Sequence, residues 1–455
     1  MAVAQAAPAG GVLGEAGQAL AEADTEVAAA LEAARERATD RISLLCAHNH
    51  PTRPVAEAEA AGLRDGWASA LAAGTGPPSP GEVLRGLARR RLGALFSAEA
   101  ANAEPDSAGA AVVAGYAALA RPGEVVLAPD PAYGAAQVHG GPLSWQARVY
   151  RFVHYGVHRE SGRVDLDEVA ALARQARPAL LVAGGVAGPE IPDYAGFAAV
   201  AASVGARLLV DAVDAAGLIA AGLHPNPVAL ADAVAICTRR GLRGPRGGGL
   251  LCRAEHARAV DRAVAAALPG APPAEVAAAK AVCLLQAGGP GFADYQRRVL
   301  AAAETLAAGL GAHGVRLVGG GTRTHVVVAD LRGLGLSGRT AERAAEQAGL
   351  LAQRAPVPCD PLPPPRCSGL RLGCAAAVSR GLGRAEFGEL AEVLGGLLLA
   401  LQEDRAGAEE WGQAAAPRIA ALARRFPVPG GTAQPYAAAQ AEAQPYAAAK
   451  AQAQP

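Results

Sequence analysis

The chain has 455 residues, enough for two or three domains and a large core. Basic and acidic residues both number 42, so the formal charge is zero, which argues against the basic surface that nucleic acids and anionic membranes require. The seven cysteines are scattered and include no CxxC pair, so they indicate reduced thiols rather than a disulfide framework or a zinc site. The basic residues include only two lysines, Lys280 and Lys450.

The N-terminal segment does not read as a targeting signal. It carries several acidic residues but no basic residue before Arg35, whereas secretory and organellar signals need early positive charge. No uncharged apolar run reaches the roughly 18–20 residues that span a membrane. We therefore expect a cytoplasmic protein without membrane or nucleic-acid partners. Within residues 1–40, the stretch 15–40 is rich in Ala, Glu and Arg and predicts a helical N-terminal arm.

From about residue 41 to 285, short apolar runs alternate with Ala-rich helical stretches. The runs at 124–127, 179–182 and 207–210 are each followed by Gly or Asp and then by a helical pattern. Continuous apolar strands that alternate with helices are typical of a parallel sheet covered on both faces. We therefore predict a large α/β domain over residues 41–285.

Residues 286–404 predict a smaller α/β domain, with a helix first and strands at 315–318 and 325–329. The Pro-rich stretch 356–366 predicts an extended loop. Both features differ from the long alternation of strands and helices before them, so we place a domain boundary near residue 286.

The last segment, 405–455, predicts a low-complexity tail. The sequence Ala-Gln-Pro-Tyr-Ala-Ala-Ala occurs at 433–439 and again at 443–449, and two copies are too few for a solenoid. Two interpretations are open: a flexible tail, or a docking segment that presents Tyr436 and Tyr446 to a larger protein assembly.

Three blocks carry residues suited to chemistry, at 208–227, 238–248 and 368–373. In the first block Asp211 ends a buried apolar run, and ligands of α/β sheets bind outside the carboxyl ends of strands. A buried carboxylate is unfavourable unless it is paired. Asp211 is therefore a candidate site residue.

These blocks resemble serine hydroxymethyltransferase, a family of pyridoxal-phosphate enzymes with the aspartate-aminotransferase-like fold (fold type I), over about residues 40–400. The match is nearly letter for letter in Ala-Gly-Leu-Ile-Ala-Ala-Gly-Leu-His-Pro-Asn-Pro at 216–227 and in Leu-Arg-Gly-Pro-Arg-Gly-Gly at 242–248. It extends to Gly-Thr-Arg-Thr-His at 321–325 and Ser-Gly-Leu-Arg-Leu-Gly at 368–373. The resemblance implies an ancestry in one-carbon metabolism, a large cofactor-type domain, a smaller C-terminal domain, and a dimer embraced by the N-terminal arm.

The resemblance also marks departures at the reacting centre. The family reads Thr-His-Lys-Thr where this chain reads Thr238-Arg239-Arg240-Gly241, so Arg240 stands in place of the lysine that forms the Schiff base with the cofactor. A guanidinium stays protonated and cannot serve as that nucleophile. Asp214 stands where the family has a histidine. The acidic Asp214 and the basic Arg240 therefore both differ from the family residues at their positions.

Further departures affect the surrounding segments. His48 lies in Ala-His-Asn-His at 47–50, where the family reads Ser-Glu-Asn-Tyr, and Ser69 replaces the glutamate that serves one-carbon transfer. Residues 74–80 replace a Tyr-Tyr-Gly-Gly segment of the folate and substrate site. The phosphate-binding His-Ser-Gly-Ser becomes Asp-Ser-Ala-Gly at 106–109, and the added carboxylate repels phosphate.

Other positions of the family site persist. The resemblance assigns Asp211 to the pyridine nitrogen, Tyr133 to stacking on the ring, and Ser107 and Gly109 to the phosphate, should the cofactor be retained. Arg371 matches the arginine that binds the substrate carboxylate, a task that suits its bidentate geometry.

Charged residues inside such a site should occur with opposite partners, because an unpaired buried charge is costly. We predict that Arg239 and Arg240 reach Asp211 and Asp214 and that no cofactor is bound, the alternative being pyridoxal phosphate held without covalent attachment. His48 begins a His-x-His pattern with no visible third ligand, so we predict no metal site.

We interpret the chain as a serine hydroxymethyltransferase-like pseudoenzyme, a structural or regulatory subunit of a homodimer or of a heterodimer with an active paralogue. Two alternatives are open. One is an enzyme that uses pyridoxal or pyridoxamine phosphate on an amino acid without a lysine Schiff base. The other is a sensor that keeps the Arg371 pocket for a carboxylate.

Overall fold

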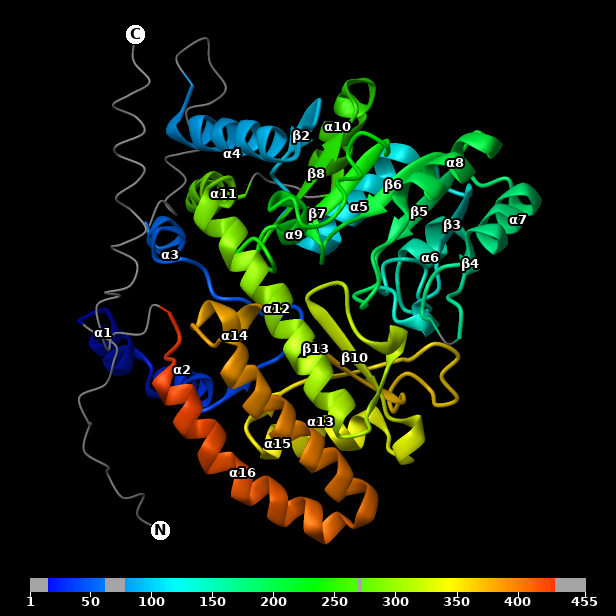
Figure 1. The fold of residues 1–455 in the computed structure, drawn as a ribbon. Coiled ribbons are helices and arrows are strands. Elements are labelled where there is room, and N and C mark those ends of the chain that lie inside the picture. The colour runs from blue at the N-terminus through cyan, green and yellow to red at the C-terminus, as the bar shows by residue number, and fades with distance from the viewer. Residues whose placement is uncertain (1–14, 62–77, 160, 268–271, 430–455) are drawn as a thin grey trace.

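The computed structural model describes residues 15–61, 78–159, 161–267 and 272–429 (Figure 1). Its central sheet has seven strands in the spatial order β2 (Ala100–Asn102), β8 (Gly248–Cys252), β7 (Ala233–Cys237), β6 (Arg207–Asp211), β5 (Leu180–Gly184), β3 (Val125–Pro129) and β4 (Arg151–Tyr155). The strands β4, β3, β5, β6 and β7 run parallel, while β8 is antiparallel to β7 and β2 is antiparallel to β8. The predicted α/β class with a mostly parallel sheet is confirmed.

Helices cover both faces of this sheet because successive residues of its strands point to opposite faces. The helices are α4 (Pro80–Phe96), α5 (Ala108–Leu119), α7 (Leu166–Ala176), α8 (Tyr194–Val204), α9 (Ala216–Ala220), α10 (Ala257–Ala267) and α11 (Ala274–Ala287). Leu208 and Val210 of β6 belong to the core on the face of α4, α7, α8 and α11. Leu209, between them, belongs to the opposite core with α5 and α10.

A second, antiparallel sheet lies at the other end of the molecule, with strands in the order β12 (Gln353–Ala355), β13 (Gly369–Gly373), β10 (Val326–Asp330) and β9 (Arg316–Leu317). Its helices are α12 (Pro290–Ala312), α13 (Gly338–Gln347), α14 (Ala375–Ser379), α15 (Arg384–Glu403) and α16 (Arg405–Arg425). The long helix α12 runs from the central sheet to this second sheet (Figure 1).

The N-terminal arm consists of two helices, α1 (Glu15–Ala23) and α2 (Thr25–Thr39), rather than one. Asp24 begins α2 because its carboxylate accepts hydrogen bonds from the backbone amides of Glu26 and Val27. The remaining short elements are β1 (Ile42–Ser43), α3 (Arg53–Glu59), α6 (Gln146–Val149) and β11 (Leu350–Leu351). Strand β1 pairs in parallel with β11.

Two segments lie on the other side of the predicted boundaries. Ile42 and Leu44 are buried in the core of the smaller domain, although the predicted large domain begins at residue 41. Helix α16 places Ile419 and Leu422 in the same core, so the ordered chain continues past the predicted tail boundary at residue 405. The predicted repeat at 433–449 lies outside the described residues.

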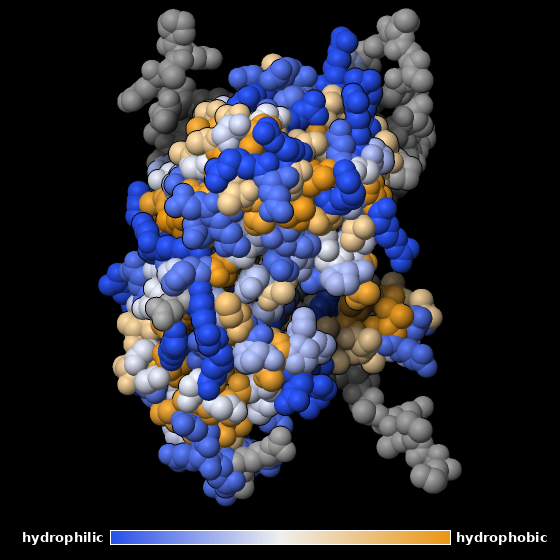
Figure 2. All heavy atoms as spheres, turned by 90° about the vertical axis from the view of Figure 1, so that its right-hand side faces the viewer, coloured by the Kyte–Doolittle hydropathy of each residue, from blue (hydrophilic) through white to orange (hydrophobic). Residues whose placement is uncertain are grey.

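Within the described ranges, no single helix is long and apolar enough to cross a membrane. The pair α11 and α12, bent by 80°, meets that criterion only when the two are taken together, by length and composition. On the face at the right of Figure 1, hydrophobic side chains are scattered among hydrophilic ones (Figure 2). Scattered apolar residues are normal for a globular protein surface.

Candidate functional site

Asp211 lies at the carboxyl end of β6, as the sequence predicts, and is 6% exposed. Its Oδ2 is 3.0 Å from Nε2 of His139, and its Oδ1 accepts a hydrogen bond from the amide of Val213 at 3.0 Å. The other ring nitrogen of His139 is 2.8 Å from the hydroxyl of Tyr116. A buried chain of three side chains, Tyr116–His139–Asp211, therefore holds this carboxylate.

A glycine makes the contact between His139 and Asp211 possible. Gly185 adopts φ +73°, and a Cβ there would lie 2.2 Å from His139 Nε2. Any side chain at this position would push the imidazole away from the carboxylate. His139 and Tyr116 are not among the predicted site residues, although the His-Gly pair at 139–140 resembles the family sequence.

Arg240 forms an ion pair with Asp214, and the side chains are 26% and 19% exposed. Burial alone would raise the pKa of Asp214, but Arg240, followed by His325 and Arg371, lowers it below its ordinary value. Burial likewise opposes the charge of Arg240, whereas Asp214 raises the pKa of the guanidinium. Both groups are therefore held in their charged forms.

The other predicted pairs are not formed. Arg239 is exposed and donates to the backbone carbonyl of Ala47 at 3.5 Å, so it reaches neither aspartate. Asp211 contacts His139 instead of an arginine. The sequence patterns could not separate the two arginines, because adjacent residues in a loop point in different directions.

Two polar side chains beside the Arg240–Asp214 pair have atoms without partners. Both ring nitrogens of His325, which is 5% exposed, and the Nε of Arg371 have no hydrogen-bond partner among the described residues. Arg371 donates through NH2 to Gln353 at 3.0 Å. Burial lowers the pKa of His325, Asp214 opposes this effect, and Arg240 adds to it.

Asn49 fixes the backbone beside this ion pair. Its Nδ2 donates to the carbonyl of Arg240 at 2.7 Å and to the hydroxyl of Tyr295 at 3.0 Å. Ser379 donates to its Oδ1 at 2.5 Å. The neighbouring His48 lies 3.0 Å from the Ser43 hydroxyl, and burial lowers its pKa. Asn49 was not predicted as a site residue. The sequence signal for it is that Asn49 keeps the family residue, whereas His48 and His50 on either side differ from the family.

Ser107 and Gly109 do not hydrogen-bond to the carboxylate of Asp211, whose partners among the described residues are His139 and the amide of Val213. Ser107 caps α5 by accepting from the amide of Ala110 at 3.1 Å, and its hydroxyl donates to Asp106 at 3.0 Å. A Cβ at Gly109 would meet nothing within 4 Å. Ser69 lies outside the described residues.

Tyr133 lines a second cavity that adjoins the one containing Asp211 and Asp214, because Gly184, Val186 and Gly188 line both. That second cavity, of about 260 Å³, is lined by both Tyr133 and Arg371. A Cβ at Gly156 would lie 3.1 Å from the Tyr133 ring, so the ring packs over this glycine. Tyr133 and Arg371 therefore line one cavity, which adjoins the cavity that contains Asp211.

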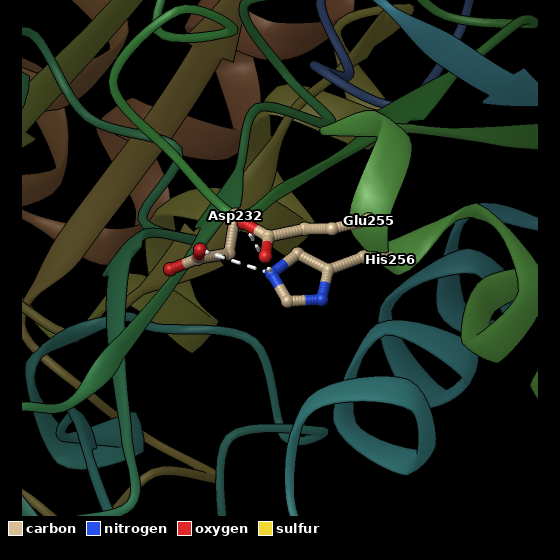
Figure 3. Close-up of side chains that lie close together, drawn as sticks. All are labelled: Asp232, Glu255 and His256. Atoms are coloured by element: carbon tan, nitrogen blue, oxygen red, sulfur yellow. Dashed lines mark hydrogen bonds and ion pairs between the residues drawn. The ribbon is translucent and has the colours of Figure 1, made fainter.

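Three potential metal ligands, Asp232, Glu255 and His256, lie close together away from this site (Figure 3). His256 Nε2 is 3.1 Å from Asp232 Oδ1 and 3.8 Å from a carboxylate oxygen of Glu255. Arg253 also lies 3.4 Å from Asp232. A guanidinium therefore already supplies positive charge to the carboxylate that would anchor a cation.

The parallel sheet with helices on both faces, the smaller antiparallel domain and the buried aspartate at the end of β6 define a fold type I pyridoxal-phosphate protein. A family model described as serine hydroxymethyltransferase matches residues 20–394. The chain belongs to this family.

This membership corrects the prediction that no cofactor is bound. The family depends on pyridoxal phosphate, so this cofactor is expected for the chain. The prediction erred because it weighted the missing lysine and the altered phosphate segment above the retained ring-nitrogen position. Members of the family are typically oligomeric, which is consistent with the predicted dimer.

The residues fit the ring end of the cofactor. A buried carboxylate that is held by His139 suits a protonated pyridine nitrogen, so Asp211 would hold that atom. Ser107 at the start of α5 would hold the phosphate once its hydroxyl leaves the Asp106 carboxylate. The covalent end has no lysine. The cavity between Asp211, Asp214 and His325 is about 30 Å³, and it shares Gly184 and Val186 with the adjoining cavity of about 260 Å³ that Tyr133 lines.

Proposed function

We propose that this chain is a serine hydroxymethyltransferase-family protein that has lost lysine-dependent catalysis and acts as a structural or regulatory subunit. The observation that carries the proposal is the ion pair of Arg240 with Asp214 at the position of the Schiff-base lysine. A guanidinium whose charge is stabilised by a buried carboxylate is a poor nucleophile. The cofactor, which supplies an electron sink for reactions of amino acids, is held without a covalent bond to this loop.

The lysines elsewhere in the chain do not replace the missing one. Lys280 is fully buried, and its ammonium donates to the carbonyls of Ala103, Pro105 and Gly248 at 2.7, 2.7 and 3.2 Å. These three bonds point the amine away from solvent and leave it no free donor. Lys450 lies outside the described residues.

The subunit role is supported by the arm. Val27 and Leu31 of α2 are 45% and 43% exposed, and they lie one helical turn apart on the same face. An exposed apolar pair on an N-terminal helix fits the family's arm-mediated dimer, so we propose a homodimer. Replacing both residues with glutamate should shift the sedimentation of the full chain from dimer to monomer, whereas an unchanged dimer would remove the arm from the interface.

Borohydride reduction tests the loss of the covalent link. The full chain is incubated with pyridoxal phosphate, reduced and digested, and adducts are located by peptide mass. We expect no adduct between residues 233 and 252 in the wild type. In Arg240→Lys we expect an adduct at residue 240, which controls for access of the cofactor to the loop.

An activity assay completes the test. Neither protein should convert serine to glycine with tetrahydrofolate, because Ser69 and the 74–80 segment also differ from the family. Folate-dependent turnover by the wild type would contradict the proposal. Turnover by Arg240→Lys alone would show that a single residue accounts for the loss.

A further inference from the structure

A cavity of about 330 Å³ opens in the smaller domain, away from the cofactor-type site. It lies where α13, the end of α15 and the start of α16 meet (Figure 1). Ser337, Thr340 and Arg343 line it from α13 and its cap, and Ala408 and Glu409 line it from α16. The family match ends at residue 394, so the wall that α16 contributes lies outside the matched region.

Three arginines surround the cavity without acidic partners. The guanidiniums of Arg339, Arg343 and Arg366 make no ion pair or side-chain hydrogen bond to any described residue. Among the described residues that line the cavity, Glu409 is the acidic one. The wall therefore carries more positive than negative charge, in a chain whose formal charge is zero.

The acidic residues of α13 do not compensate this charge because they are engaged elsewhere. Glu342 pairs with Arg354, and Glu346 pairs with Arg37 and Arg41 at 3.1 Å each. Arg339 and Arg343 stand four residues apart on the same helix, where like charges repel. An anion between them would remove that repulsion.

The side chains, rather than the helix terminus, would hold such an anion. The first amides of α13 are already used: those of Gly338 and Arg339 donate to the carbonyls of Cys367 and Arg366, and that of Thr340 donates to the Ser337 hydroxyl. The hydroxyls of Ser337 and Thr340 are 2.9 Å apart and face the cavity as further polar groups.

We propose that this cavity binds a small phosphorylated metabolite. Guanidiniums offer paired, planar N–H donors that match phosphate oxygens, and three of them approach from two segments of the chain. A volume of about 330 Å³ lies at the lower end of the range for small-molecule sites, which is larger than a single inorganic ion needs. The ligand bridges α13 and the loop that carries Arg366, beside the start of α16.

Pyrophosphate is the probe for this site, titrated into the full chain by calorimetry at constant ionic strength. We expect saturable binding and a rise in the melting temperature. Arg339→Gln with Arg343→Gln should weaken binding at least tenfold. Glu409→Gln should tighten it severalfold, because the repulsive carboxylate is removed.

The matched control is Arg258→Gln with Arg262→Gln on α10. These two arginines are also exposed and four residues apart, but they lie far from the cavity wall in sequence and do not line it. Binding should be unchanged in this variant. The proposal would be overturned if pyrophosphate binding to the wild type did not saturate. It would also be overturned if the control variant lost as much affinity as the Arg339 and Arg343 variant, because binding would then depend only on the overall charge of the protein.

The inference is independent of the proposed function. In the Arg240→Lys variant, borohydride trapping at residue 240 should be the same with and without the Arg339 and Arg343 substitutions. A loss of trapping in that double variant would mean that the cavity serves the cofactor and not a separate ligand, which also contradicts the proposal.

Discussion

Two aspartates three residues apart, Asp211 and Asp214, meet different partners. Asp211 is 6% exposed and contacts His139, which in turn contacts Tyr116. Asp214 is more exposed and pairs with the charged Arg240. The carboxylate of Asp211 is held by a histidine and can still accept a hydrogen bond from a ring nitrogen. The carboxylate of Asp214 is instead neutralised by the full positive charge of Arg240.

The difference shows how one end of a site can change while the other persists. Asp211 is held by His139 and by the amide of Val213, which follows β6, and His139 is held in turn by Tyr116 of α5. These residues belong to the central sheet and to the segments that cover it. The contact of Asp214 comes from one loop residue, Arg240. Substitutions in a loop disturb fewer neighbours than substitutions in the core, so the lysine end is the end that differs from the family.

The largest expected effect comes from removing Asp211. Asp211→Ala leaves His139 and the amide of Val213 buried without an acceptor, so we expect the free energy of unfolding to fall by about 4 kcal/mol. Urea denaturation measures this loss. Asp211→Asn, which keeps the shape and one acceptor, should lose less; equal losses would mean that the carboxylate charge is not used.

A second prediction concerns Lys280, a buried charge that only neutral carbonyls hold. Burial lowers its pKa to about 8, whereas Lys in an unfolded chain titrates near 10.5. Between these values the unfolded chain binds more protons, so stability should rise with pH across this window, by about 3 kcal/mol at most.

Lys280→Met tests this dependence, because methionine has similar length and does not titrate. The variant should be less stable at pH 7, since three carbonyls lose their donor, and it should lack the rise above pH 8. A rise of the same size in both proteins would assign the pH dependence to other groups.

Asp214→Ala should have a smaller effect than Asp211→Ala. It leaves Arg240 unpaired but about a quarter exposed to water, so we expect a loss of about 2 kcal/mol. The double variant Asp214→Ala with Arg240→Ala should recover part of that loss. A double-mutant cycle measures the coupling, and additive losses would show that the pair contributes nothing to stability.

The smallest expected effect comes from Asn49→Ala, about 1 kcal/mol. The carbonyl of Arg240 loses one hydrogen bond, while the hydroxyls of Tyr295 and Ser379 keep each other and the carbonyl of Ala375 as partners. Thermal unfolding measures it. Ser43→Ala removes a contact of the neighbouring His48 and serves as the control. If both variants unfold alike, Asn49 does not position the arginine loop.

The fold was predictable because its signals are local: apolar runs define the strands, and the block at 216–227 is nearly unchanged from the family. The partner of Arg240 followed from charge, since an arginine and an aspartate differ from the family together. The partner of Asp211 did not, because a buried carboxylate accepts from a histidine as readily as from an arginine. The cavity at Arg343 was hidden because its residues come from three separate segments.

The packing of α16 has a practical consequence for anyone shortening the protein. Arg380, which is 8% exposed, donates to the carbonyls of Ala423 and Phe426 at the end of α16 and to that of Arg41 after the arm. A version cut at residue 394, where the family match ends, would strip the cover from Phe387 and Leu394 in the core. The smallest fragment worth expressing therefore extends to residue 426 or beyond.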